Sequence, residues 1–407
     1  MMKTAYIIAE YNPFHNGHRH HLEQTRRLTG ADCVVAVMSG NYVQRGEAAV
    51  GEKLLRAQTA VLGGVDLVLE LPVKYAVSNA GRFAAGAVAV ALACGAEGYL
   101  SFGASATLAE LKALAAFLCD PALEAEARDL CRDRGKTYPA AVDALLRQKG
   151  MAGEADLLKD ANNVLAVEYL KRLPEGGPLC PIAVERPLRR GHDAPAPDGD
   201  MASASFLRGL LYEENALAGG LPPRLADYMP RQTFCLLEEA LREGRFPLDR
   251  RLFSVAAFSR LLTVSAANFA RLDNVNQGLE NKLAQAVRDS ACMEEVAAAV
   301  KSKRFTLARL RQILLAATLG VTKEDASSAP SYLRVLAFND RGREALARMR
   351  ETATLPVVTN LSDAVKQPSC ARDAALEYQA DKLFDACLPR PRGGNRPFQA
   401  HPVYVSN

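Results

Sequence analysis

The stretch AYIIAEYNPFHNGH, residues 5–18, places a short apolar run directly before a turn and the start of a helix. A run such as residues 5–9 is typical of a buried strand. Pro13 stiffens the turn, and Gly17 lacks the Cβ that would hold a ligand away from the backbone. A strand that passes through a turn into a helix presents unpaired N–H groups and a partial positive charge. The stretch therefore predicts a site for an anion such as phosphate.

Three more apolar runs follow at intervals long enough for a crossover helix: residues 33–38, 67–71 and 98–103. This rhythm predicts an α/β fold with a parallel sheet covered by helices on both faces. Residues 182–184 are a further candidate strand. Ligands of such sheets bind where strands end and helices begin, and residues 10–18 occupy the first of these junctions.

The chain of 407 residues is long enough for two or three domains. We expect a parallel-sheet domain over 1–215, a mostly α-helical and basic domain over 216–388, and an exposed or disordered tail over 389–407. The proline-rich segment 190–201 is either a mobile lid or a surface connection.

Composition indicates a soluble globular protein, with 49% hydrophobic and 24% charged residues. The nine cysteines form no Cys-x-x-Cys pair, so reduced thiols in a cytoplasmic protein are expected. The apolar run at the N-terminus is too brief for a signal peptide. The longest apolar stretch, residues 84–96, is well short of the roughly 20 residues that span a bilayer, so no membrane association is expected.

Four of the six histidines fall within seven positions. His15 and His18 are three residues apart and can face one bound group if the helix begins near them. As N–H donors they would stabilise the charge that builds on an α-phosphate when pyrophosphate is displaced. The alternative is that they cap the helix or lie on its surface. His20 and His21 are expected on the exposed helix, and a zinc site is disfavoured because suitably spaced carboxylates or cysteines are missing.

The HNGH of residues 15–18 matches the His-x-Gly-His signature of the nucleotidyltransferase superfamily. Further matching segments are VAVMSGNYVQRGEAA (35–49), GVDLVLELP (64–72), NNVLAVEYLK (162–171), SASFLR (203–208), VKSKRFTLARL (300–310) and YLRVLAFNDRGR (332–343). In this order they resemble the bacterial tRNA(Met) cytidine acetate ligase family over nearly the whole chain.

The resemblance implies a Rossmann-like nucleotidyltransferase domain and an ATP-dependent ligase. Members of that family activate acetate as acetyl-adenylate and transfer the acetyl group to the exocyclic amine of the wobble cytidine of elongator tRNA(Met), which forms N4-acetylcytidine. ATP, acetate and the tRNA are the implied ligands, and Mg²⁺ is expected because ATP is normally handled as its metal complex.

The same resemblance implies roles for single residues. His15 and His18 stabilise the adenylation transition state, and the loop from Ile8 to His21 surrounds the ATP. The ATP contacts of that loop are Ile8, Ala9, Glu10, Tyr11, Asn12, Pro13, Phe14, Asn16, Gly17 and His21. Further ATP contacts match Gly103, Asn162 or Asn163, and Arg186.

The SASFLR segment stands where the superfamily has its second signature. Ser203, Ser205 and Arg208 are candidates for the β and γ phosphates, because hydroxyls and a guanidinium suit phosphate oxygens. An ordinary helix N-cap is the alternative, and both can hold at once. Arg45 is a candidate for a carboxylate or an RNA phosphate and Asn41 lies near it, whereas Asp66 and Glu70 are assigned no chemistry.

The chain departs from the family pattern at three positions. Ala104 and Ser105 follow Gly103 where a glutamate is usual, Ala161 replaces a proline, and Ser205 replaces a threonine. The missing glutamate puts the local geometry in doubt.

The positive charge lies in the second half of the chain. Residues 271–350 hold 14 Lys and Arg against nine Asp and Glu, a net +5, whereas the whole chain is +4. The densest part surrounds Phe305 and supplies the candidate RNA contacts Lys301, Lys303, Arg304, Arg309 and Arg311. A solvated basic helix face is the alternative. Two other functions also remain open: an adenylyltransferase acting on a small metabolite, and a non-catalytic RNA-binding protein.

Overall fold

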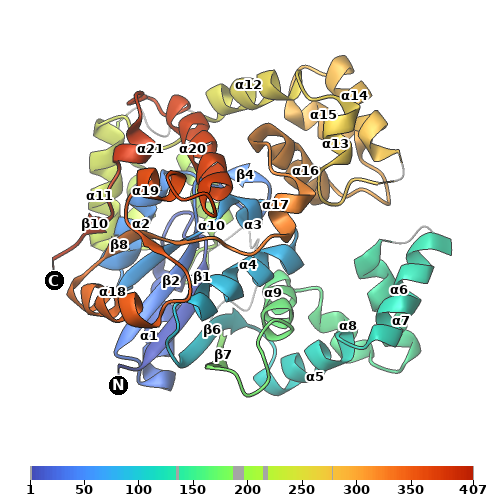
Figure 1. Ribbon diagram of the computed structural model, residues 1–407, viewed down its shortest axis with the longest axis horizontal. Coiled ribbons are helices and arrows are strands. Elements are labelled where there is room, and N and C mark those ends of the chain that lie inside the picture. Colours follow the sequence, from blue (N-terminus) through green and yellow to red (C-terminus); the bar gives the residue numbers. More distant parts are fainter. Residues whose placement is uncertain (1, 134–136, 187–196, 214–218, 277, 407) are drawn as a thin grey trace.

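The computed structural model describes residues 2–133, 137–186, 197–213, 219–276 and 278–406. Its centre is a mixed sheet between layers of helices (Figure 1). Five strands are parallel and adjacent in the order β5 (Leu67–Leu71), β2 (Cys33–Ser39), β1 (Thr4–Ala9), β6 (Gly98–Ala104) and β7 (Leu179–Glu185). The four apolar runs that predicted a parallel sheet are confirmed as β1, β2, β5 and β6, and the further candidate strand at 182–184 is confirmed as part of β7.

The remaining strands are short or come late in the chain. β8 (Leu333–Phe338) pairs antiparallel with β5, and β9 (Val357–Val358) and β10 (Val403–Tyr404) each pair parallel with β8. β3 (Tyr42–Val43) and β4 (Glu47–Ala48) form a separate antiparallel pair.

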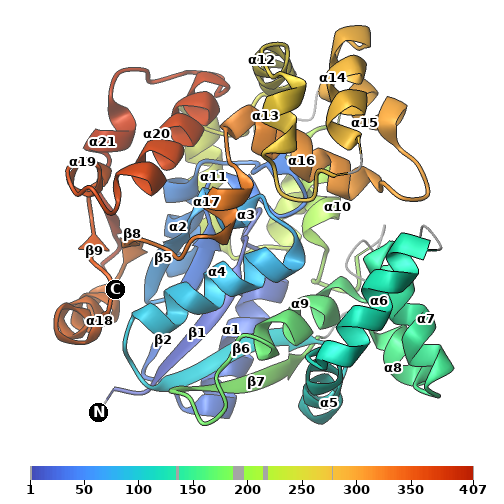
Figure 2. The same cartoon turned by 45° about the vertical axis from the view of Figure 1, so that its right-hand side comes forward.

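The helices lie on both faces of the sheet and in two groups beside it. They are α1 (Asn16–Thr29), α2 (Lys53–Leu62), α3 (Val73–Ala76), α4 (Ala80–Ala93), α5 (Leu108–Leu118), α6 (Pro121–Asp133), α7 (Tyr138–Gln148), α8 (Ala152–Leu157), α9 (Ala161–Leu170), α10 (Ala204–Leu211), α11 (Arg231–Arg242), α12 (Arg250–Leu261), α13 (Ala266–Ala270), α14 (Leu279–Asp289), α15 (Met293–Val300), α16 (Leu307–Leu319), α17 (Lys323–Ser327), α18 (Asp340–Thr352), α19 (Leu361–Val365), α20 (Ala371–Ala386) and α21 (Arg396–Gln399). The turned view places α13–α16 beyond the edge at which the parallel strands end, and α5–α8 beside β7 (Figure 2).

Both faces of the sheet are buried, which explains why its strands are continuous apolar runs. Successive side chains of a strand point to opposite faces. Tyr6 of β1 and Val35 of β2 belong to the core formed with α4 and α9. Their neighbours Ile7 and Ala36 belong to the core formed with α1 and α2.

The expectation of an almost purely helical region beyond residue 216 is wrong for residues 333–338, which return to the main sheet as β8. A fully buried strand has no alternation, so its apolar run does not distinguish it from a helix. The expectation of a disordered tail is wrong for α21 and β10. Pro397 is buried, and Arg396 lies 3.1 Å from a carboxylate oxygen of Glu52.

A buried ion network holds β8 and α20 against the parallel strands. The Lys53 ammonium lies 2.6 Å from Glu70 and 2.7 Å from Asp381, and the Arg334 guanidinium lies 3.2 Å and 3.4 Å from the same two carboxylates. Glu377 completes the group at 3.7 Å from Lys53. Glu70 is therefore a partner in a structural ion network. The three carboxylates could surround a cation, and the Lys53 ammonium already lies among them.

Glu377 is the carboxyl of this network that is hardest to ionise. Burial and the neighbouring Glu70 raise its pKa well above the usual range, whereas Lys53 and the Val73 N–H oppose the rise. With a proton on Glu377, the two cations Lys53 and Arg334 face the two carboxylates of Glu70 and Asp381. Burying a charge without a partner is costly, so a proton on Glu377 keeps the network neutral.

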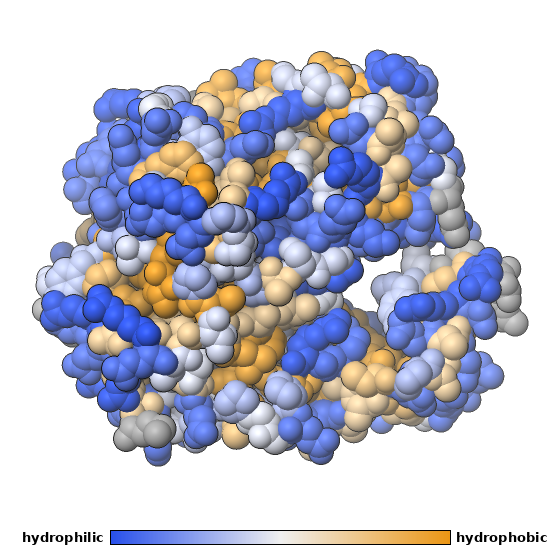
Figure 3. Space-filling view, viewed as in Figure 1, coloured by the Kyte–Doolittle hydropathy of each residue, from blue (hydrophilic) through white to orange (hydrophobic). Residues whose placement is uncertain are grey.

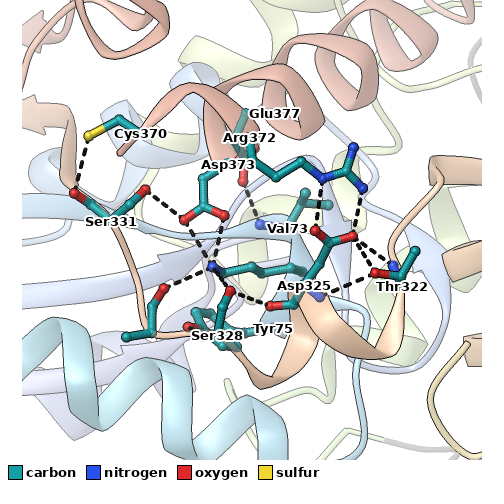
Figure 4. Close-up of polar contacts among 12 residues, drawn as sticks. Val73, Tyr75, Thr322, Asp325, Ser328, Ser331, Cys370, Arg372, Asp373 and Glu377 are labelled. Carbon is teal, nitrogen blue, oxygen red and sulfur yellow. Dashed lines mark hydrogen bonds and ion pairs between the residues drawn. The ribbon is translucent and has the colours of Figure 1, made fainter. Parts of the chain in front are cut away.

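A second buried contact ties α3 to α20 (Figure 4). The Lys74 ammonium donates to both carboxylate oxygens of Asp373, at 2.8 Å and 2.9 Å, and to the Ser328 hydroxyl at 2.8 Å. Ser331 donates to Asp373 at 2.7 Å. Removal of Asp373 would leave a buried ammonium without its counter-charge.

We predict that Glu377→Gln matches wild type in the free energy of unfolding near about pH 4 and exceeds it at neutral pH, whereas Glu70→Gln lowers it at neutral pH by about 3–5 kcal/mol because two buried cations lose a partner. A raised carboxyl pKa contributes stability at low pH that is lost as pH rises from about 4.3 through the folded-state pKa. Wild type should therefore lose stability relative to Glu377→Gln as pH rises through that window. Urea unfolding at a series of pH values measures both effects. Parallel pH profiles of the two proteins would contradict the assignment.

Candidate functional site

The loop between β1 and α1 folds inward. Tyr11 and Phe14 are buried, and Tyr11 adopts a left-handed φ of 46°. A non-glycine residue in that region is strained and is held there by its surroundings. The ring of His18 packs against both aromatic rings, with centroids 4.9 Å from Tyr11 and 5.6 Å from Phe14.

His15 and His18 form the cap of α1. Nδ1 of His15 accepts the N–H of Gly17 at 3.1 Å, and Nδ1 of His18 accepts the N–H of His15 at 3.3 Å. The hydrogen of each neutral ring therefore lies on Nε2. The rings are stacked with centroids 3.7 Å apart, and His15 is 7% exposed. The two histidines therefore cap the helix, and the same hydrogen bonds leave Nε2 as the nitrogen that can donate. Capping and donation to a ligand are compatible.

Gly17 has a second reason to be glycine. A Cβ at this position would lie 2.9 Å from Cε1 of His15, closer than side chains approach one another. The glycine therefore makes room for the imidazole ring as well as for a ligand. The first turn of α1 contains no acidic residue, so its positive end is not neutralised there.

A cavity of about 240 Å³ opens over the ends of β1, β6 and β7. The strand order changes direction between β1 and β6, which is where open α/β sheets bind ligands. The predicted residues that line this cavity are Ile8, Ala9, Glu10, Tyr11, Asn12, His15, Gly17, His18, His21, Gly103, Asn162, Arg186, Ser203 and Arg208. Arg45 lies there too.

Cationic groups gather at one part of the cavity. Arg208 donates to the carbonyl of Asn12 at 2.9 Å, and burial lowers the pKa of its guanidinium against the opposing effect of Glu47 and Glu10. Ser203 caps α10 by accepting the Phe206 N–H at 3.1 Å. The predicted N-cap is confirmed, and the capped helix start faces the cavity that Ser203 lines.

Five predicted ATP contacts do not line the cavity: Pro13, Phe14, Asn16, Asn163 and Ser205. Phe14 is fully buried in the core. The Asn16 amide donates to the carbonyls of Asp200 and Asp227, at 3.0 Å and 3.2 Å. Phe14 and Asn16 are therefore engaged by packing and by hydrogen bonds within the protein.

Of the two alternatives, Asn162 lines the cavity and Asn163 does not. Asn163 is 1% exposed, and its amide oxygen accepts the N–H of Ser105 at 3.0 Å. The Ser105 hydroxyl accepts from Asn163 and donates to Asp160, both at 3.0 Å. Ser105, which follows Ala104 where the family has a glutamate, therefore anchors the start of α9 through hydrogen bonds.

The expectation that His20 and His21 lie exposed on the helix is wrong. Both are partly buried and line the cavity. Nε2 of His21 lies 3.1 Å from the Ser101 hydroxyl, which lies 2.7 Å from that of Thr25. Burial, with His20 and Arg186, lowers the pKa of His21 to about 4. His21 therefore offers the cavity a neutral ring.

Sequence reasoning also missed an apolar part of the lining: Phe83, Phe102, Leu165, Tyr169 and Val184. Two of these residues lie close in the sequence to predicted site residues. Phe102 immediately precedes Gly103 at the end of a strand, and Leu165 lies three residues, nearly one helical turn, after Asn162.

The five candidate RNA contacts do not form one open surface. Lys301 and Lys303 are exposed and Arg304 is partly exposed, whereas Arg309 donates to the carbonyl of Asn274 and lies 5.1 Å from the ring centroid of Phe305. Burial lowers the pKa of Arg309. Arg311 pairs with Glu47 at 3.7 Å.

Packing also engages other residues noted in the sequence. Phe305, which lies among the candidate RNA contacts, is 6% exposed and belongs to a hydrophobic core. Asn41 is buried and donates to Asp381 at 2.8 Å. Asp66 accepts hydrogen bonds from the N–H of Val34 at 2.7 Å and from Arg26 at 2.6 Å, which is a structural role.

Most of the proline-rich segment 190–201, residues 190–196, lies outside the described residues.

In the described part of the chain, the helices are too short or too polar to cross a bilayer. The space-filling view shows polar residues around the periphery, hydrophobic residues over parts of the centre, and a hollow between the α5–α8 group and α13–α16 (Figure 3).

We predict that the ring resonances of His21 do not titrate above about pH 5, in contrast to an ordinary histidine, which titrates near pH 6.5. A lowered histidine pKa contributes stability at neutral pH that is lost as pH falls from about 6.5 toward 4. NMR spectra of selectively labelled histidine, assigned with His21→Gln, measure the titration. A midpoint near 6.5 would contradict the burial of this ring.

Comparison with known proteins gives one consistent result. The model of the family described as HIGH Nucleotidyl Transferase matches residues 2–396. The tRNA(Met) cytidine acetate ligase of Acetivibrio thermocellus is 32% identical over 402 residues, which cover 96% of each chain. Crystal structures of Thermotoga maritima TmcAL, apo and bound with alpha-thio ATP, superpose with TM-scores of 0.90 and 0.89 at 32% and 31% identity and cover 100% of both chains.

Proposed function

Since this chain belongs to the HIGH nucleotidyl transferase family and, within it, to the tRNA(Met) cytidine acetate ligases, we propose that it uses ATP to join acetate to the exocyclic amine of the wobble cytidine of elongator tRNA(Met). The products are N4-acetylcytidine, AMP and pyrophosphate. The observation that carries this proposal is the pair of imidazoles at the start of α1. Both use Nδ1 for the backbone and both line the cavity.

In the first step, an acetate oxygen attacks the α-phosphorus of ATP and pyrophosphate leaves. Acetate is already ionised at neutral pH, so this step needs no base. The Nε2–H groups of His15 and His18 donate to the α-phosphate oxygens as negative charge builds there. The positive end of α1, whose first turn contains no acidic residue, adds to this stabilisation.

The cationic part of the cavity suits the leaving pyrophosphate. Arg208, Arg45 and Ser203 would contact the β and γ phosphates, while Gly103, Asn162 and Arg186 would contact the nucleoside. Among the described residues, Glu10 and Glu185 are the only carboxylates that line the cavity. Two carboxylates do not form a complete set of protein ligands for Mg²⁺. The cavity lining therefore fits magnesium that enters bound to the phosphates of ATP.

In the second step, the cytidine amine attacks the acetyl carbonyl carbon, AMP leaves with the bonding electron pair, and the amine loses a proton. The RNA would reach the cavity from the side of α16. Arg311 of that helix pairs with Glu47, close to the cavity residues Gln44 and Arg45. Lys301, Lys303 and Arg304 precede the same helix and would contact RNA phosphates.

We predict that His15→Ser abolishes most adenylation while it preserves the helix. Serine is a good N-cap but cannot reach the ligand as an imidazole does, so acetate-dependent ATP–pyrophosphate exchange should fall by about 10²-fold or more with little change in Tm. His18→Ala should show a similar loss of exchange. His401→Ala, on an exposed histidine near the C-terminal end, is the matched control.

The decisive assay supplies ATP, labelled acetate and total tRNA, followed by nucleoside digestion. Labelled N4-acetylcytidine is the expected product. Exchange supported by another acceptor without tRNA labelling would favour a metabolite adenylyltransferase, and tRNA binding without ATP affinity would favour a non-catalytic protein.

We predict that Lys301→Ala/Lys303→Ala weakens tRNA binding and lowers the salt slope of log K by up to about 2, because two phosphate contacts release counterions. Acetate-dependent pyrophosphate exchange without tRNA should stay unchanged. Filter binding at several salt concentrations measures the slope. Lys366→Ala, on a lysine that is 74% exposed in another region, is the control. An equal effect of both variants would argue against a specific RNA surface.

A further inference from the structure

The β3–β4 pair and its turn lie between the catalytic loop and the basic helix α16. On the cavity side, the N–H of Gln44 donates to a Glu10 carboxylate oxygen at 2.7 Å. Just beyond β4, the N–H of Val50 donates to the side-chain oxygen of Asn12 at 2.7 Å. Both acceptors belong to the loop that carries His15. The segment 42–48 is therefore fixed to the wall of the ATP cavity.

On its other side the same segment is fixed to α16. The side-chain amide of Gln312 donates to the carbonyl of Gln44 at 2.6 Å and to the carbonyl of Ser78 at 3.2 Å. Gln44 is thus bound through its N–H to Glu10 and through its carbonyl to Gln312. Gln312 acts here only as a donor, because both of its partners are carbonyl oxygens.

Close packing supports these bonds. Gly46 adopts φ +77°, and a Cβ there would lie 2.6 Å from backbone atoms of both Arg311 and Gln312. The turn therefore rests directly on the backbone of α16. The nearby Arg311–Glu47 pair spans 3.7 Å, but both side chains are more than a third exposed, so it adds little.

We propose that Gln312 is a positioning residue for adenylation, which holds the 42–48 segment so that Glu10 and Arg45 keep their places in the ATP cavity. This deepens the proposed function and rests on it. Gln312 does not line the cavity, so it acts through Gln44. Small misplacements of cavity groups reduce catalytic rates strongly even when the altered residue lies outside the site.

The test compares two substitutions of Gln312, one without a hydrogen-bond donor and one with a donor. Gln312→Met keeps the length of the side chain and removes the donor, whereas Gln312→Lys supplies a donor without an acceptor. Gln285→Met, on an exposed glutamine of α14 that contacts Asp289 and Arg288, is the matched control. The measurement is acetate-dependent ATP–pyrophosphate exchange without tRNA, together with Tm.

We expect Gln312→Met to lower kcat for exchange by about tenfold or more with a Tm within about 2 °C of wild type, and Gln312→Lys to recover most of the loss. A merely structural contact would lower Tm and leave kcat of the folded protein unchanged. Wild-type kcat in Gln312→Met, or a lysine variant as slow as the methionine variant, would overturn the proposal.

Hydrogen exchange separates this proposal from the proposed function. The Gln44 amide should exchange faster in Gln312→Met than in wild type. Without the Gln312 amide, the carbonyl of Gln44 loses its hydrogen bond to α16, and the bond from the Gln44 N–H to Glu10 should open more often. This readout needs no activity. If wild type shows no acetate-dependent exchange, the proposed function fails, and unchanged protection of the Gln44 amide overturns the positioning role independently.

Discussion

The geometry of the candidate site depends on a constraint placed on two ring nitrogens. Nδ1 of His15 and Nδ1 of His18 accept backbone N–H groups at the start of α1. The helix therefore decides the tautomer of both rings and turns a flexible pair of imidazoles into a fixed pair of Nε2–H donors. A lone histidine on a loop would have to order its ring when the ligand binds. Here that ordering is already complete in the folded chain.

Hydrogen bonds connect this loop to more distant parts of the protein. The loop that carries His15 accepts hydrogen bonds from Gln44, Val50 and Arg208, and Gln44 is in turn held by α16. Helices that would meet RNA are thus connected to the cavity through a few backbone hydrogen bonds. The buried Lys53–Asp381 and Arg334–Glu70 contacts keep the later part of the chain on the same sheet.

Much of the fold could be predicted because its signals are local. Four apolar runs and a proline–glycine turn are enough to indicate the parallel sheet and the position of the first loop. The later strand β8 could not be predicted, because an unbroken buried run has the same pattern in a strand and in a helix.

The residues of the candidate site were also predicted best where their signals are local. Most cavity residues of the first loop were found, whereas Phe83 lies outside every motif and joins the cavity through tertiary packing. His20 and Tyr169 lie beside or within quoted motifs, but the sequence pattern did not show that they face the cavity. Arg309 and Phe305 looked like an RNA surface in sequence, yet both are taken up by packing within the helices.

The antiparallel pairing of β8 with β5 has a consequence for synthesis on the ribosome. Leu333 is the first residue of β8, so the residues before position 333 have been made before the open edge of β5 receives its neighbour. Until then Lys53 and Glu70 lack Arg334 and Asp381, and a row of unpaired backbone groups faces solvent. A truncated chain that ends before this strand would contain every residue of the nucleotide cavity and still be prone to aggregate.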